Sequence, residues 1–242
     1  MEYFNVSKEE IDNKMFNVFV GISLGNKLLT PKLVKHYVEW AHKHSRDDAI
    51  ILIADKIDSI NWEVFSGFSS EDAQKKARDK GYSILGMFDK ARRTLARETG
   101  DMSYISRLHI VFWEDIINPG YKMLRNILQE KYETNKDFRE KVLFFVNKYV
   151  ELRDADVSKE NKDKLAGYII DELPTLIGGV YWDKKLYNLI LYPTYVDSGM
   201  SQFVLDIRGG KYFNASDLEL RQISVLVEDY LKKPEDLRIL NG

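Results

Sequence analysis

The chain has 242 residues with 36 basic and 38 acidic side chains, and its formal charge of −2 does not indicate a general nucleic-acid-binding protein, although a local basic surface is compatible with it. The absence of cysteine excludes disulfides, thiolate metal sites and cysteine nucleophiles, and it favours a reducing compartment. No apolar run approaches the roughly 18 to 20 residues that cross a bilayer, and the N-terminus lacks a secretory signal, so we expect one cytoplasmic domain over residues 1–242 without membrane attachment.

The first predicted element is a strand that ends at a glycine–serine turn. Residues 16–22 are mostly apolar and β-branched, Gly21 and Gly25 bound the turn, and an amphipathic helix is expected over residues 31–44. Ligands of open α/β sheets bind outside the carboxyl ends of the strands, so Ser23 lies where a nucleophile would be useful. The same pattern also fits an ordinary β-to-α turn whose serine only satisfies backbone groups.

Buried strands and helices alternate along the rest of the chain. A continuous apolar run at residues 49–54 is typical of a strand that is buried on both faces of a parallel sheet. The alternation predicts a doubly wound α/β sheet with right-handed crossovers. Further strands are expected at residues 108–113, 187–191 and 203–207. Helices are expected at residues 71–98, from 121, and at 137–152, 159–176 and 215–231, and a loop at 59–68.

The predicted helix at residues 71–98 is basic. It carries eight basic side chains against four acidic ones as far as residue 97, an excess of 8 − 4 = 4 positive charges. Lys90, Arg93 and Arg97 are spaced three and four residues apart and therefore share a helix face. Such a stripe can follow a phosphate backbone, and it can equally be a solvated helix face.

One helix near the C-terminus pairs a phenol with a carboxylate. Tyr168 and Glu172 are four residues apart and project from the same side, whereas Asp171 points about 100° away. We expect Pro174 to kink or end this helix. A carboxylate on an apolar face needs a partner, so this pair is a candidate site; an exposed helix end is the alternative.

Other catalytic patterns find little support. The histidines form no set that could bind a metal. A serine–histidine–aspartate hydrolase would require a histidine at the end of a strand, whereas His109 lies inside a predicted strand. The chain has no glycine-rich phosphate loop.

Taken together and in order, several short motifs resemble the cyclodipeptide synthases. The resemblance covers the chain from about residue 18 to residue 192 and rests on the ordered set, since no single motif is specific. The motifs are Gly21-Ile22-Ser23-Leu24-Gly25-Asn26, Trp40-Ala41, Asp55, Tyr168-x-x-x-Glu172-x-Pro174 and Tyr192-Pro193.

The resemblance implies a fold and a reaction. The fold would be a Rossmann-like three-layer sandwich with a mostly parallel central sheet, similar to the catalytic domains of class I aminoacyl-tRNA synthetases. The HIGH- and KMSKS-like motifs that bind ATP in those synthetases are missing here. Two aminoacyl-tRNAs would be the substrates, joined into a 2,5-diketopiperazine through an aminoacyl-enzyme and then a dipeptidyl-enzyme on Ser23. No cofactor or metal is expected, and a monomer is favoured over a dimer.

The resemblance also assigns roles to residues. Ser23 would carry the acyl groups, Glu172 and Tyr168 would hold the α-amino group of the first aminoacyl unit, and the tRNA ribose hydroxyls or Tyr192 would assist proton transfer. For the substrate pocket we select Phe19, Gly21, Asn26, Leu52, Thr175 and Leu176. For the acceptor arm of the first tRNA we select Lys90, Arg92, Arg93 and Arg97.

One departure from the family pattern concerns its two groups. One group has Asn at the position of Asn26 and Gln after the late tyrosine. The other has Pro after that tyrosine and usually a different residue at the position of Asn26. This chain combines Asn26 with Pro193, and we expect it to belong to the proline group because proline fixes the backbone beside Tyr192. The alternative function is a non-catalytic tRNA-binding module with a synthetase-like fold.

Overall fold

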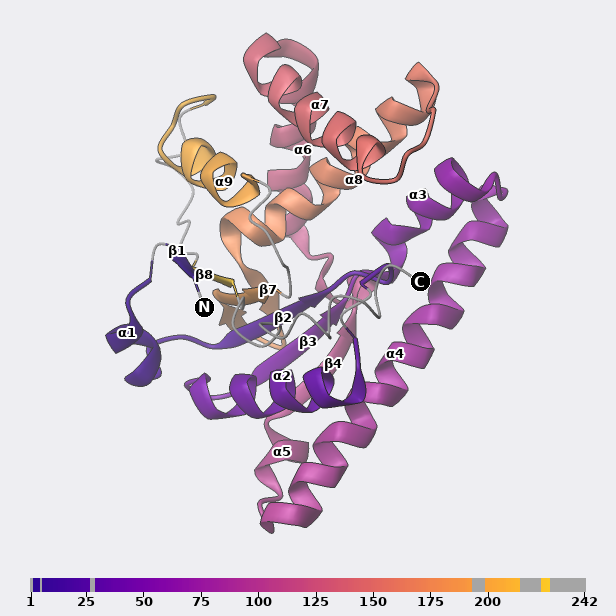
Figure 1. Cartoon of the computed structure of the whole chain (residues 1–242). Helices are drawn as coiled ribbons and strands as arrows, with labels where there is room; N and C mark the ends of the chain where they lie inside the picture. Colours follow the sequence, from indigo (N-terminus) through magenta and orange to yellow (C-terminus); the bar gives the residue numbers. More distant parts are fainter. Residues whose placement is uncertain (1, 5, 27–28, 193–198, 214–222, 227–242) are drawn as a thin grey trace.

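A computed structural model describes residues 2–4, 6–26, 29–192, 199–213 and 223–226 (Figure 1). Its central element is a six-stranded sheet in the order β1-β8-β7-β2-β3-β4. β1 pairs antiparallel with β8, and every other neighbouring pair is parallel. The strands are β1 (Glu2–Phe4), β2 (Val18–Ile22), β3 (Ala49–Ile53), β4 (Leu108–Phe112), β7 (Leu189–Tyr192) and β8 (Ile223–Leu226).

Helices cover both faces of this sheet (Figure 1). Alternate side chains of β2 point to opposite faces of the sheet. Val18, Val20 and Ile22 pack toward α2 and α4, whereas Phe19 belongs to a second core that includes Trp113. Beside the first face lie α1 (Lys8–Asp12), α2 (Pro31–His44), α4 (Ser70–Thr99) and α5 (Ser103–Ser106).

The second face meets a helical bundle with its own apolar core. One buried residue from each helix illustrates it: Leu128, Val142, Ile170 and Phe203. The bundle consists of α6 (Pro119–Thr134), α7 (Lys136–Glu151), α8 (Lys159–Gly178) and α9 (Met200–Arg208). Three shorter elements complete this side: a 3₁₀ turn η1 (Trp113–Ile116) and a hairpin of β5 (Val180–Trp182) and β6 (Lys185–Tyr187). The predicted α/β class with a mostly parallel sheet is confirmed, while one domain over residues 1–242 stays a prediction.

The loop predicted at residues 59–68 is wrong. α3 (Asp55–Ser66) occupies this segment and ends at Gly67, whose φ of 67° is the left-handed conformation that commonly terminates helices. Asp55 and Asp58 lie in its first turn, where carboxylates favour the positive end of the helix dipole. The aromatic content of the segment concealed this short helix.

The C-terminal predictions are also corrected. Residues 203–207 form part of α9 rather than a strand, and their buried members Phe203, Val204 and Ile207 have helical spacing. The helix predicted at 215–231 is wrong at residues 223–226, which form β8, and its remainder lies outside the described residues. α8 continues through Pro174 to Gly178, so the proline does not end the helix.

Asp55 ties three elements together at the carboxyl edge of the sheet. Its buried carboxylate accepts a hydrogen bond from Arg78 Nη1 of α4 at 2.6 Å and one from the backbone N–H of Trp113 at 3.2 Å. A charge buried in this way needs its partners, because either partner left alone would lose solvation without compensation.

Replacing Asp55 with alanine should therefore lower the free energy of unfolding by about 2 to 3 kcal/mol, measured by chemical denaturation. Asp79→Ala is the control, since it removes the same charge from an exposed position of α4 and should change stability by less than about 0.5 kcal/mol. Equal effects of the two substitutions would contradict an anchoring role for Asp55.

Candidate active site

Ser23 follows the last residue of β2 and begins a tight turn. The N–H of Asn26 donates to the carbonyl of Ser23 at 3.1 Å, which closes the turn. The N–H of Leu24 donates to Asp58 Oδ2 of α3 at 2.7 Å, and the backbone of Gly25 also bonds to this carboxylate. β2 lies between β7 and β3, so the serine sits at the centre of the sheet's carboxyl edge.

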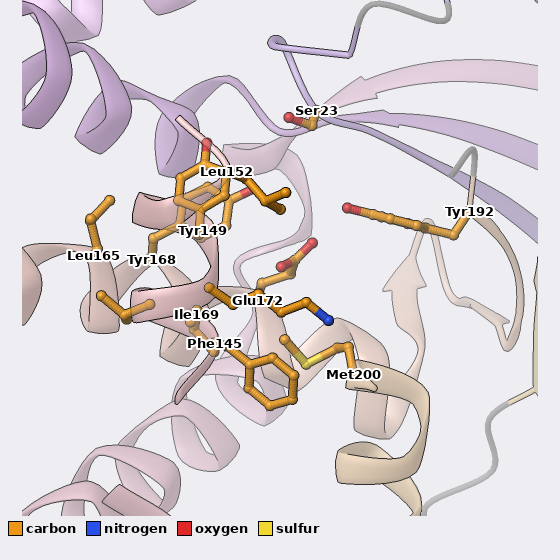
Figure 2. Close-up of a pocket in the computed structure, with 12 residues that line it drawn as sticks. Ser23, Phe145, Tyr149, Leu152, Leu165, Tyr168, Ile169, Glu172, Tyr192 and Met200 are labelled. Atoms are coloured by element: carbon orange, nitrogen blue, oxygen red, sulfur yellow. The ribbon is translucent and has the colours of Figure 1, made fainter. Parts of the chain in front are cut away.

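The four predicted catalytic residues line one cavity. Tyr168 and Glu172 come from α8, Tyr192 ends β7, and the cavity measures about 200 Å³. Figure 2 shows the Glu172 carboxylate and the Tyr192 hydroxyl pointing into the space below Ser23. Three elements that are far apart in sequence thus bring a hydroxyl, a carboxylate and two phenols together.

Burial and like charge control the protonation of this group. Burial and, secondarily, the negative charge of Asp58 raise the pKa of Glu172 to about 7. The Glu172 charge and burial raise the pKa of Tyr192 well above its usual range, and burial raises that of Tyr168. Near neutral pH, therefore, Glu172 exchanges a proton readily while both phenols keep theirs.

Asp58 is the residue of the candidate site that the sequence analysis did not select. It is buried, and burial raises its pKa even though Asn61 and the backbone of Leu24 donate hydrogen bonds to it. The available signal was a second acidic residue three positions after Asp55, at the end of an apolar strand. That signal becomes meaningful only once residues 55–66 are recognised as a helix, which turns Asp58 toward the serine turn.

A second, smaller cavity lies behind Ser23, between the sheet and α8. Its volume is about 10 Å³. A β-carbon at Gly21 would lie 3.4 Å from the Tyr192 ring, so the glycine lets this ring approach β2. Asn26 lines neither cavity and contributes its backbone to the turn. The other predicted pocket residues all line the smaller cavity: Phe19, Gly21, Leu52, Thr175 and Leu176.

The basic residues selected on α4 lie away from both cavities, in the half of the helix that extends toward α5 (Figure 1). Arg92 is largely buried, donates to the carbonyl of Leu108 at 2.7 Å and thereby fixes α4 to β4. Arg93 pairs with Asp89 at 2.7 Å, whereas Lys90 and Arg97 are exposed. Arg92 therefore has a structural role in addition to any role in binding.

Metal and membrane functions gain no support from the part of the chain that the structure describes. Within it, no group of three histidine, cysteine, aspartate or glutamate side chains could hold a metal ion. Neither cavity there is lined by a histidine, and His109 lies inside β4 as predicted. None of the helices described is long and apolar enough to span a bilayer.

A family model described as cyclodipeptide synthase matches residues 4–195. The chain belongs to the cyclodipeptide synthase family. A search of curated proteins gave no match. The predicted family is thereby confirmed.

Solved cyclodipeptide synthases confirm the fold. One from Fluoribacter dumoffii superposes with a TM-score of 0.68 at 17% identity, over 92% of this chain and 95% of that chain. One from Mycobacterium tuberculosis, described as showing a relation to type I tRNA synthetases, gives 0.63 at 17% identity, over 89% and 87%. One from Candidatus Glomeribacter gigasporarum, bound to Phe-tRNAPhe, gives 0.55 at 14% identity, over 89% and 92%. The predicted Rossmann-like, synthetase-type sandwich is correct.

The group within the cyclodipeptide synthase family is not decided by these comparisons. Asn26 is described, and its N–H closes the serine turn. Pro193 lies outside the described residues. Membership of the proline group stays a prediction.

Asp58→Asn should lower the pKa of Glu172 from about 7 toward the 4.3 usual for glutamate, because the ionised form loses a repelling neighbour. The side-chain oxygen of the new asparagine can still accept the hydrogen bond from the Leu24 N–H. Its NH₂ group can donate to Asn61 Oδ1 once the Asn61 amide flips, and this oxygen is buried without a partner in the described structure. An NMR titration of labelled Glu172 measures the change. Asp171→Asn is the control: Asp171 pairs with Arg125 at 2.8 Å, so its replacement should leave the Glu172 titration nearly unchanged. An unchanged Glu172 titration in Asp58→Asn would refute the coupling between Asp58 and Glu172.

Proposed function

We propose that this cyclodipeptide synthase condenses the aminoacyl groups of two aminoacyl-tRNAs into a 2,5-diketopiperazine, with Ser23 as the acyl carrier. The supporting observation is the single cavity lined by Ser23, Tyr168, Glu172 and Tyr192. The aminoacyl ester of a charged tRNA is already activated, so acyl transfer to a serine preserves that activation and requires no ATP.

In the first step Ser23 Oγ attacks the ester carbonyl of one aminoacyl-tRNA. The new serine ester forms, the bond to the ribose oxygen breaks, and the serine proton ends on the departing ribose hydroxyl. Tyr192 can relay this proton, because its raised pKa keeps the phenol protonated between transfers. A neighbouring ribose hydroxyl is the other route. Esters are reactive enough for this chemistry without a histidine base.

The second step uses the amine of the serine-bound group as the nucleophile. Glu172 and Tyr168 hold this amine, and Glu172 accepts its proton, a task suited to a pKa of about 7. The amine attacks the ester of the second aminoacyl-tRNA, an amide forms, the bond to the ribose oxygen breaks, and Glu172 returns the proton to that departing oxygen. The free amine of the resulting dipeptidyl-enzyme then attacks the Ser23 ester, which closes the ring and returns a proton to Ser23 Oγ.

The basic side chains of α4 are proposed to contact the first tRNA. This helix has 30 residues and is therefore about 45 Å long, enough to follow an acceptor arm away from the site. The related enzyme bound to Phe-tRNAPhe supports an aminoacyl-tRNA substrate. Within the selected set, Lys90, Arg93 and Arg97 are the exposed members.

Ser23→Ala should abolish both the covalent adduct and the cyclic dipeptide. Intact-protein mass spectrometry after incubation with charged tRNA detects the adduct, and product masses detect the dipeptide. Ser83→Ala, an exposed serine of α4, is the control and should retain both. Normal product from Ser23→Ala would exclude the acyl-enzyme. Binding of tRNA without any adduct in the unmodified protein would favour a non-catalytic tRNA-binding module.

Reversing Arg93 and Arg97 to glutamate should weaken tRNA binding and flatten its dependence on salt, because fewer counterions are released on binding. Fluorescence anisotropy at several salt concentrations measures both effects. The double reversal of Lys122 and Lys136, exposed on α6 and α7, changes the net charge equally and serves as the control. If tRNA binding by the two double variants depended equally on salt concentration, the basic side chains of α4 would not contact tRNA.

A further inference from the structure

The smaller cavity lies where the side chain of a serine-bound aminoacyl group would be held. Ser23 and Glu172 line both cavities, and the smaller one continues inward from them between the sheet and α8. An acyl group that stays on Ser23 with its amine near Glu172 can therefore place its side chain in the smaller cavity. The larger cavity opens beside Leu152, whose surface is 79% exposed. That open route suits a second aminoacyl group that arrives on its tRNA. This assignment rests on the proposed function.

The walls of the smaller cavity are bulky and well packed. Phe19, Leu52, Trp113 and Ile190 are at most 3% exposed and fill the space next to Gly21, the one lining residue without a side chain. A volume of about 10 Å³ is close to the minimum that holds a single water molecule. A methyl group matches this space, whereas a branched or aromatic side chain does not.

The largest wall residue is held in place. The Trp113 backbone N–H donates to Asp55, its Nε1 donates to the Tyr121 hydroxyl at 3.2 Å, and that hydroxyl donates to the carbonyl of Asp171 at 2.7 Å. Moving the indole to enlarge the cavity would break these hydrogen bonds, and forcing extra methylenes into a packed core costs stability.

We infer that the first aminoacyl group accepted by this enzyme has a side chain no larger than a methyl group, so that alanine and glycine are taken and leucine and phenylalanine are rejected. The walls away from Ser23, Glu172 and Tyr192 are apolar except for Thr175, whose hydroxyl donates to the carbonyl of Glu172, so alanine fits best. One extra methylene in a hydrophobic pocket changes kcat/KM by about 10-fold to 200-fold.

The test uses one mixture of tRNAs that is charged separately with each amino acid. The reactions then differ in the amino acid and not in the tRNA. The rate of adduct formation on Ser23 is measured by intact mass for glycine, alanine, leucine and phenylalanine. Alanine should acylate the enzyme at least 10-fold faster than leucine or phenylalanine. Equal rates for alanine and leucine would overturn the inference and leave the proposed function standing.

A wall variant tests the cause of the selection. Leu176 is half-buried at the cavity, and Leu176→Ala should raise acylation by leucine at least 10-fold. Leu85→Ala removes the same atoms from a half-buried leucine of α4 outside both cavities and should leave the preference unchanged. Leu176→Val provides a milder change, with a smaller gain in the same direction. No gain in either Leu176 variant would refute the size limit, whereas no adduct with any amino acid would refute the proposed function itself.

Discussion

The site depends on one buried carboxylate. Asp58 receives the backbone hydrogen bond of Leu24 and so fixes the turn that presents Ser23, and its charge helps to raise the pKa of Glu172 on α8. A serine turn at the end of a strand is otherwise free to adopt several conformations. α3 therefore links the proposed nucleophile and the carboxylate proposed to bind the amine, although its own side chains line neither cavity.

The sequence predicts the parts of this fold whose pattern is local. The apolar run of β3 and the capped, amphipathic α4 are found as expected, because burial on two faces and a serine N-cap leave clear periodicities. α9 was mistaken for a strand, since a short run such as residues 203–207 satisfies both periods and only packing in the bundle decides.

For the candidate site, the sequence predicts which residues share an element but not which elements meet. Tyr168 and Glu172 share a helix face, and this follows from their spacing, but their approach to Ser23 follows only from how α8 crosses the sheet. Asp58 required a helix that was not expected, and the hydrogen bond of Arg92 to β4 required a tertiary contact. Side-chain roles that depend on non-local partners are therefore the ones that sequence patterns leave open.

Because the pKa of Glu172 is raised to about 7, its carboxyl group holds a proton in part of the molecules near neutral pH. Asp58 and Glu172 repel each other, so near neutral pH the unliganded enzyme is partly protonated at Glu172. In the proposed reaction, the ammonium group of the substrate supplies the missing positive charge and displaces that proton. Binding of the charged amine and release of a proton are thus one linked equilibrium, and the affinity for an ammonium group rises as the pH increases through about 7.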